Sequence, residues 1–450
     1  MLEIAGDEVS EKLLKCVAYT LELLLGKDFR RQHSGVRILY QEPEENTSEY
    51  PVLYIVPSGF FGEKYGTADS LPVLPLQQID GIPLLFGSPK VERKGKRVIV
   101  YADIIASAFF LVTRYEEVVR RDVRDEHGRF PGKESLPYRA GFIDCPIVED
   151  YAGLLRKWLR EAGVNVEEPK REFTVLLTHD VDSIRKYRRI SQPFRQAAKA
   201  FLGREPFGSI LESAAVVLGL KKDPYNNFEE LFELAESLDE QEVGPKRESV
   251  YFFMSGGEGK YASLYNIRAK DVKRIIQEVS ESGAGIGLHT SYDAGLNPEL
   301  IEKEKTLLED VCGFAIRGNR YHYLAWREVE DGWSLAKAGI NWDSTLGYAD
   351  VAGFRLGVCR PIELFDPVRM EPFGIEEHPL IVMECTLSRT NYMNLGEEEA
   401  FDYCKKLIDQ TRKYNGEFVM LWHNTMFFPV AGNYHPKLYR RLLREFSYAE

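Results

Sequence analysis

With 450 residues, 44% of them hydrophobic, the chain is long for one domain and apolar enough for sizeable cores. Its formal net charge of −12 argues against a general nucleic-acid-binding protein, which needs a basic face to neutralise phosphates. Six cysteines without a CxxC pair argue against a zinc ribbon or a dense disulfide framework. The N-terminus lacks the basic-then-apolar order of a secretory signal, and no apolar run is long enough for a membrane span. We therefore expect a cytoplasmic protein.

The first part of the chain mixes helical and strand patterns. Helical periodicity over residues 9–26 is followed by the strand-like runs RILYQ and YPVLYIV, and then by a strand that leads into an apolar helix. In the charged stretch DEHGRFPGKES, which includes His127, the glycines and proline favour a solvated turn over a loop with a functional role. An acidic, proline-containing segment then marks a boundary near residue 170. We predict a smaller α+β accessory domain over residues 1–170.

From residue 171 the pattern changes to strands that alternate with helices. The apolar runs TVLLT, SVYFFM, AGIGL, FAIRG and EFVMLW predict strands, and amphipathic segments between them predict helices. Such alternation indicates a parallel sheet with crossover helices, either open or closed into a barrel. The segment from 184 to 248 is long enough to be a mostly helical insertion. We predict a second domain over residues 171–450.

Polar side chains follow these predicted strands at the points where each strand ends. In parallel α/β folds, functional groups gather at the carboxyl ends of the strands, so these side chains are expected to lie near one another. Four of the eight histidines have such positions. The full set is His179, Asp180, Asp182, His289, Arg317, Arg320, His322, Asp343 and His423.

Each of these residues also has a purely structural interpretation. Asp180 and Asp182 could cap a following turn. On an extended strand end, however, they point to the same side, so one can bind a divalent cation while the other takes a proton. His423 could equally pack in the core beside Trp422, and a helix cap is the favoured interpretation of Asp343 in WDST.

Five motifs carry a resemblance to a known family: THDVD, GLHTSYD, RGNRYHY, NWDST and LWHN. Their order and spacing resemble those of the NodB-homology polysaccharide deacetylases (carbohydrate esterase family four), in a branch with an extra N-terminal domain. The resemblance extends over residues 173–430. It implies a distorted (β/α) barrel of some seven strands. It also implies a metal-dependent hydrolase, with zinc as the expected divalent metal, that removes N-acetyl groups from a sugar or polysaccharide precursor.

The same resemblance assigns roles residue by residue. It makes Asp180 the general base and Asp182 a metal ligand. The family's second motif has two histidines separated by three residues; His289 matches the first, and Asp293 occupies the position of the second. An aspartate can ligate zinc through oxygen, but His322 is the favoured third ligand because imidazole suits zinc.

Two further roles complete the expected site. Arg317 or Arg320 resembles the arginine that orients the base through a charge-assisted hydrogen bond. His423 matches the general acid, and Tyr292 is a candidate for holding the oxyanion. We expect the N-terminal domain to pack against the barrel and to cover one side of the cleft.

Two alternative functions remain open from the sequence. Because Asp293 departs from the family motif, the chain could be a catalytically inactive glycan-binding protein. The same fold also hosts amide hydrolases that act on small cyclic substrates. Acetate release from N-acetylated sugars would distinguish the deacetylase from both.

Overall fold

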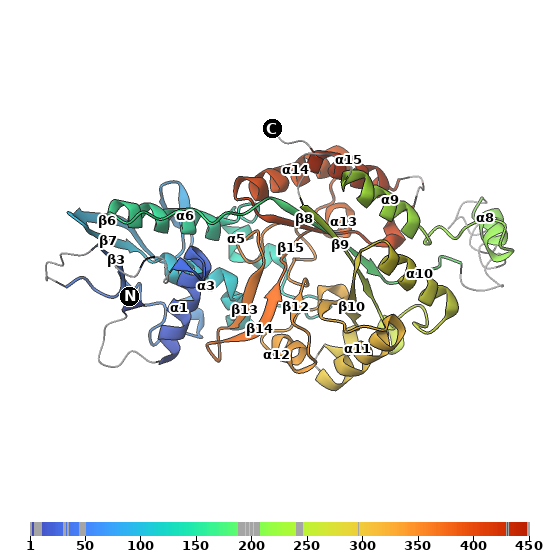
Figure 1. The fold of residues 1–450 in the computed structure, drawn as a ribbon, viewed down its shortest axis with the longest axis horizontal. Helices are drawn as coiled ribbons and strands as arrows, with labels where there is room; N and C mark the ends of the chain where they lie inside the picture. Colours follow the sequence, from blue (N-terminus) through green and yellow to red (C-terminus); the bar gives the residue numbers. More distant parts are fainter. Residues whose placement is uncertain are drawn as a thin grey trace.

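The structure, a computed structural model, describes residues 2–3, 11–29, 33, 36–44, 51–187, 194, 198, 201, 208–239, 246–295, 297–428, 430 and 432–447. Its strands form two main sheets, which lie at the left and in the centre of Figure 1. Part of the insertion predicted over 184–248 lies outside the described residues, and its described part contains the helices Gly208–Val217 and Phe228–Asp239. The α-helices are α1 (Glu11–Leu25), α3 (Ile104–Val112), α4 (Tyr115–Val119), α5 (Leu136–Arg139), α6 (Ile147–Glu161), α8 (Gly208–Val217), α9 (Phe228–Asp239), α10 (Lys270–Glu281), α11 (Pro298–Cys312), α12 (Glu330–Lys337), α13 (Glu384–Ser388), α14 (Glu397–Lys413) and α15 (His435–Ser447).

The first sheet has the strand order β1-β2-β3-β7-β6 among the described residues. Its strands are β1 (Leu2–Glu3), β2 (Arg37–Tyr40), β3 (Val52–Ile55), β6 (Gly87–Lys94) and β7 (Arg97–Ala102). All four residues of β3 are buried, as expected for an apolar strand with neighbours on both edges. A separate hairpin pairs β4 (Gln77–Ile79) with β5 (Ile82–Leu84). Since β1, β2, β3 and β7 pair in parallel, the sheet is more parallel than the α+β class that we predicted.

The second sheet has the order β13-β14-β12-β11-β10-β9-β8-β16-β15 in the described part of the chain. Its strands are β8 (Thr174–Val181), β9 (Lys246–Phe253), β10 (Gly285–Thr290), β11 (Gly318–Tyr321), β12 (Trp342–Asp343), β13 (Ile362–Asp366), β14 (Glu371–Glu377), β15 (Leu380–Met383) and β16 (Glu417–Leu421). All neighbouring strands pair in parallel except β13 and β14.

Helices cover this second sheet from outside. Figure 1 shows α14, α15 and α9 along one side and α10, α11 and α12 along the other. Among the described residues, no pairing joins the edge strands β13 and β15, so the sheet is open in its hydrogen bonding. The fold is therefore a mixed α/β fold with a large, mostly parallel sheet, and closure into a barrel stays a prediction.

The chain between β7 and β8 links the two sheets through buried contacts. Every residue of α3 is buried, and one continuous hydrophobic cluster runs from α1 to α15. Two buried ion pairs join the first region, the chain before β8, to the second region, the chain from β8 onward. One links Arg114 to Glu328 at 2.6 Å, and the other links Arg355 to Glu117 at 2.6 Å. The predicted boundary at residue 170 falls between α6 and β8, and a division into domains there stays a prediction.

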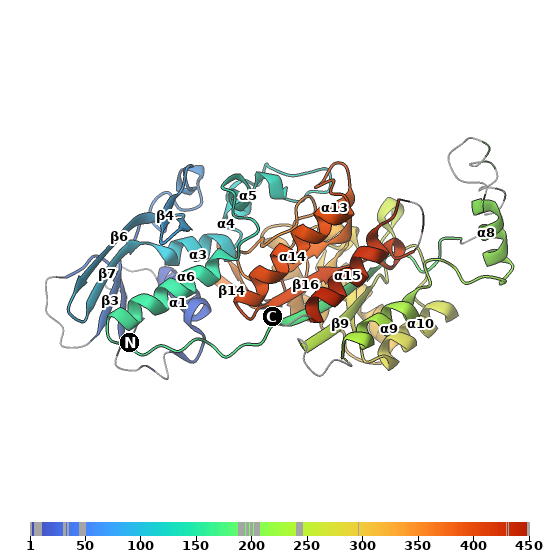
Figure 2. The same ribbon diagram turned by 90° about the horizontal axis from the view of Figure 1, so that it is seen from above.

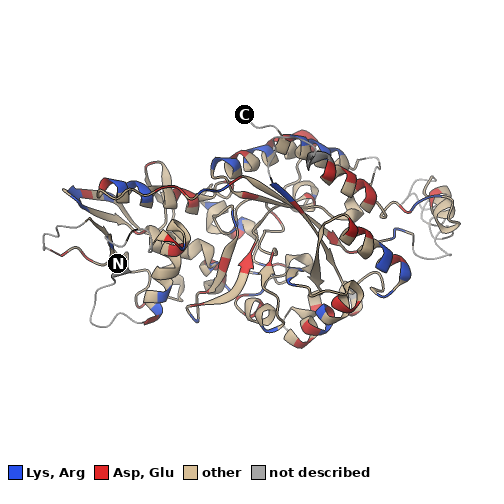
Figure 3. Ribbon diagram, in the orientation of Figure 1, with Lys and Arg blue, Asp and Glu red and all other residues tan. Residues whose placement is uncertain are grey.

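Acidic and basic residues are interspersed over the outer helices in the view of Figure 3. No helix within the described ranges is long and apolar enough to cross a membrane. Seen from above in Figure 2, α8 stands apart from the other helices, beyond α9 and α10.

His378 links the end of β14 to the start of β16 and gives this sheet a pH-dependent contact. Its Nδ1 lies 2.9 Å from Glu417 Oε1, and its Nε2 lies 3.6 Å from Glu376 Oε1. Burial lowers the pKa of His378, but the two carboxylates raise it by more, from an ordinary 6.5 to about 10. Stabilisation by this histidine is therefore complete below pH 6.5 and is lost as the pH rises towards 10.

We expect His378→Gln to destabilise the protein more at pH 6 than at pH 10, because only the protonated ring pairs with both carboxylates. The check is the urea midpoint of wild type and variant at both pH values. An equal loss at the two values would contradict the assigned charge state.

Candidate functional site

The two aspartates of the opening motif lie at the carboxyl end of β8. This strand runs on through His179 and Asp180 to Val181, so the polar residues begin inside the strand and not after it. Asp180 is buried, whereas the side chain of Asp182 is 26% exposed. The Asp182 carboxylate therefore lies at the boundary between the buried Asp180 and solvent.

His289 lies in β10, two strands away from β8 in the sheet, and points at the same carboxylate. Its Nε2 is 3.4 Å from Asp182 Oδ1 and 3.6 Å from Asp180 Oδ2. Its Nδ1 lies 2.9 Å from the backbone oxygen of Arg320, to which it donates when protonated there. That hydrogen bond fixes the ring and leaves the lone pair of Nε2 directed at Asp182.

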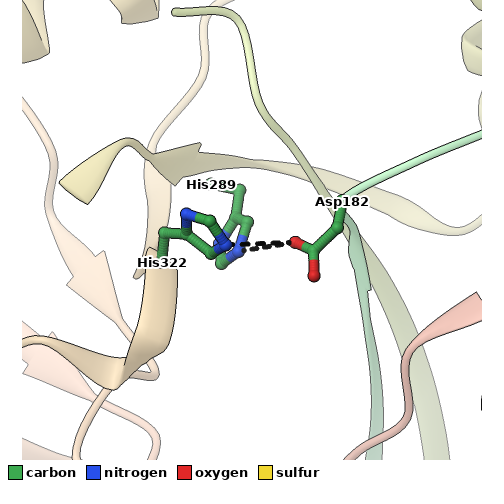
Figure 4. Close-up of side chains that lie close together, drawn as sticks. All are labelled: Asp182, His289 and His322. Carbon is green, nitrogen blue, oxygen red and sulfur yellow. Dashed lines mark ion pairs between the residues drawn. The ribbon is translucent and has the colours of Figure 1, made fainter. Parts of the chain in front are cut away.

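His322 follows directly after β11 and completes a cluster of three ligand-type side chains. Its Nε2 lies 3.7 Å from Asp182 Oδ1. Figure 4 shows the rings of His289 and His322 side by side, both facing the Asp182 carboxylate. One ligand atom from each residue lies within 4.8 Å of the others, which is the spacing of a metal-binding group.

The chemistry of this cluster fits a divalent metal. Two imidazoles and one carboxylate are a known zinc donor set, and two atoms bound to one tetrahedral zinc lie about 3.3 Å apart. Asp182 Oδ1 and His289 Nε2 are buried atoms without a hydrogen-bond partner in the described part of the chain. An ion between them would satisfy both atoms, so Asp182, His289 and His322 are the residues that could hold it.

Asp182 and His322 are in the charge states that bind metal, whereas the upward shift of the His289 pKa favours a protonated ring that a metal ion must deprotonate. Burial raises the pKa of Asp182, but His289, His322 and His423 lower it by more, so the carboxylate is ionised. Burial lowers the pKa of His322 to about 4, which keeps its imidazole neutral. For His289, burial lowers the pKa, but the charges of Asp180 and Asp182 give a net upward shift. A neutral imidazole and an ionised carboxylate are the forms that bind metal.

Arg320, not Arg317, lies beside Asp180. Arg320 is fully buried, and its Nη1 is 3.8 Å from Asp180 Oδ1. Its Nη2 donates to Ser344 Oγ at 2.7 Å, which anchors the guanidinium. Arg317 precedes β11 and is exposed. The run FAIRG that we predicted as the strand ends where β11 begins, and this shift explains why the sequence left the two arginines undecided.

His423 lies on the other side of Asp182 and has a buried carboxylate partner. Its Nε2 is 3.9 Å from Asp182 Oδ2, and its Nδ1 is 2.6 Å from Glu384 Oε1. Burial lowers the pKa of His423, but Glu384 raises it by more, to about 10. The imidazole is therefore protonated at neutral pH, and its Nε2 can give up a proton beside Asp182.

Glu384 was not among the residues predicted from the sequence. This residue follows directly after the apolar strand β15, as Asp182 follows β8, and it is fully buried. A carboxylate immediately after an apolar strand was the signal that could have identified it. His423 is thus not the core residue that the alternative interpretation described, because its ring is held by a charged partner.

Three other residues lie outside the cluster. Asp293 is exposed, and its Oδ2 accepts a hydrogen bond from the backbone of Glu258. His179 is turned away, with Nδ1 2.8 Å from the backbone oxygen of Trp422. The cap interpretation of Asp343 is wrong, because no helix follows it before β13; it binds Asn319 at 2.7 Å in the buried interior.

The loop DEHGRFPGKES of the first region lies at the rim of this cluster, so its interpretation as a solvated turn is wrong. The ring of His127 stacks on that of Tyr323 with centroids 4.5 Å apart, and Tyr323 follows His322 directly. The Tyr292 hydroxyl, our candidate for the oxyanion, instead donates to the backbone oxygen of His127 at 3.1 Å. Tyr261 packs against the same rings. The first region therefore contributes to one wall of the site.

Part of the chain matches a known family model. Residues 11–163 match a family of unknown function (DUF7033). No curated protein is significantly similar to this chain.

Among solved structures, a candidate polysaccharide deacetylase from Mycobacterium smegmatis is 17% identical, with a TM-score of 0.40 over 63% of this chain and 87% of its own. A polysaccharide deacetylase from Bacillus cereus is 11% identical, with a TM-score of 0.31 over 62% and 93%. A CE4 family pseudoenzyme from Bacillus anthracis is 10% identical, with a TM-score of 0.30 over 64% and 68%. Similarities this distant assign no activity to the chain.

Proposed function

We propose that this chain is a metal-dependent hydrolase that removes N-acetyl groups from a sugar or polysaccharide precursor. One observation carries the proposal. Three ligand-type side chains meet at Asp182, with a carboxylate–arginine pair on one side and a protonated histidine on the other. A protein that only binds glycans needs neither a general base nor a general acid.

Asp182, His289 and His322 would hold the metal, for which zinc is the expected ion. When bound, such an ion acidifies a water molecule and polarises a carbonyl group. Asp180 accepts the proton of the attacking water, and Arg320 keeps its carboxylate oriented. His423 donates the proton that the departing amine needs. Each of these proton transfers contributes about 10²–10⁴-fold to a rate.

The N-acetylated sugar comes from the family resemblance, and the rim of the site is compatible with it. Tyr323 and His127 are part-exposed rings that stack on each other beside His322, so the exposed part of this stack could contact a sugar ring. Two further aromatic residues of this segment, Tyr321 and Trp326, are buried and belong to the core.

The test combines metal content with product formation. We expect purified protein to contain one equivalent of a divalent metal and to release acetate from N-acetylated sugars. Bound glycan without acetate release would indicate the glycan-binding alternative. Hydrolysis of small cyclic amides without deacetylation would indicate the amide hydrolase.

Glu384→Gln is expected to shift the alkaline limb of the pH–rate profile to lower pH. The carboxylate holds the pKa of His423 at about 10, so its removal lets that pKa fall towards the ordinary histidine value. A general acid works only while protonated, so activity is lost at lower pH in the variant. The measurement is kcat/KM against pH, and an unchanged alkaline limb would exclude His423 as the acid.

A further inference from the structure

His289 and His322 are held in different ways. The Nδ1 of His289 is fixed by the backbone oxygen of Arg320 at 2.9 Å. The Nδ1 of His322 is buried and has no hydrogen-bond partner among the described residues. Metal-binding histidines are usually oriented by a hydrogen bond from the second ring nitrogen. His322 must therefore be positioned by its backbone and its ring neighbours.

The backbone after His322 has an unfavourable conformation. Tyr323 has φ 64° and ψ 10°, and Leu324 also has a positive φ of 54°. This left-handed region is uncommon for bulky residues, because the Cβ atom approaches the following carbonyl group. Such a turn persists only where surrounding contacts hold it.

Arg129 supplies that contact from the first region of the chain. Its Nη1 donates to the backbone oxygen of Tyr323 at 2.8 Å. Its side chain is 8% exposed and pairs with Asp125, from Nη2 to Oδ2 at 2.6 Å. Asp125 in turn accepts hydrogen bonds from the backbone nitrogens of His127 and Arg129. The ion pair with Asp125 thus fixes the guanidinium in the orientation in which it binds the Tyr323 carbonyl.

We propose that Arg129 is a positioning residue for the metal site: by holding the Tyr323 carbonyl, it stabilises the left-handed turn that aims His322 at Asp182 and His289. This inference rests on the proposed function, since it takes His322 as a ligand. It also gives the first region a role in the site, because Arg129, 45 positions before the start of β8, sets the geometry of a ligand that follows β11.

The test is the zinc affinity of the full-length protein, measured by competition with a fluorescent zinc chelator. Arg129→Ala is expected to weaken zinc binding about 10- to 100-fold, as loss of an outer-shell partner does. Arg129→Lys should behave similarly, because one ammonium group lacks the fork that reaches Asp125 and the Tyr323 carbonyl together. The matched control is Arg124→Ala. Arg124 donates to backbone oxygens of the same region, including Glu117 at 2.9 Å, and within the described ranges none of these hydrogen bonds reaches the turn.

A double-mutant cycle separates positioning from a general loss of structure. Glycine adopts positive φ at little cost, so in a Tyr323→Gly background the strain at position 323 is removed and the turn depends less on the Arg129 contact. The effect of Arg129→Ala on zinc affinity should then be much smaller than in the wild type. An equal effect in both backgrounds would overturn the positioning role.

The remaining outcomes are also distinguishable. Equal zinc affinity of wild type and Arg129→Ala would overturn the inference and leave the proposed function intact. Failure of the wild type to bind zinc would overturn both. The melting temperature of the metal-free protein shows whether each variant folds as the wild type does. If Arg129→Ala does not fold, the zinc affinity is measured on Arg129→Lys instead.

Discussion

Asp182→Ala is expected to lose both the bound divalent metal and all measurable turnover. One atom of this residue, Oδ1, lies within 3.7 Å of the nitrogens of both His289 and His322, so its removal leaves only two ligand-type groups. The loss of metal affinity should be greater than the decrease of about 10- to 100-fold that follows removal of a residue that only orients a ligand. Metal content by elemental mass spectrometry, together with acetate release, provides the check.

Asp293→Ala is the matched control for this variant. Asp293 occupies the position of the family's second histidine, but it is exposed and binds the backbone of Glu258. We expect this variant to keep its metal and its activity. Metal loss in Asp293→Ala would contradict the choice of His322 as third ligand.

Asp180→Asn is expected to keep the metal and to lose activity by about 10²- to 10⁴-fold, the range for removal of a general base. Asparagine has nearly the same shape as aspartate but accepts no proton at neutral pH. Asp180 is not among the three grouped ligand-type residues, so metal content should stay at the wild-type value. The measurement is kcat alongside metal content.

The pH profile gives an independent test of the same assignment. If Asp180 is the base, the residual activity of Asp180→Asn should lack the acid limb that the wild type shows. Wild-type turnover in this variant would rule out Asp180 as the base. Joint loss of metal and activity would instead make Asp180 a ligand.

Much of the second sheet could be predicted from the sequence, because its strands are apolar runs that end in polar residues. The runs before Asp180, His289 and His423 correspond to β8, β10 and β16. The strand before Arg320 was misplaced, since FAIRG is followed by the true β11. A short strand with few apolar residues carries little periodic signal, and a small shift changes which side chain reaches the site.

The choice between His322 and Asp293 depends on geometry that local patterns do not encode. Asp293 lies in a single 3-10 turn, η4 (Tyr292–Ala294), whose residues bind His127 and Glu258, far away in the sequence. Likewise, the loop around His127 has ordinary turn residues, and its contact with Tyr323 joins positions almost two hundred residues apart. Glu384 belongs to no motif, although its position after β15 follows the same rule as Asp182.

The buried pairs Arg114–Glu328 and Arg355–Glu117 have a consequence for the evolution of the chain. Loss of one partner leaves an uncompensated buried charge, which costs about 3–5 kcal/mol. A substitution of either partner alone is therefore destabilising. Recombination that exchanged the segment before β8 for one from a distant relative would break both ion pairs at once. We expect the two regions to have been inherited as a single unit, with paired changes at these four positions across descendants.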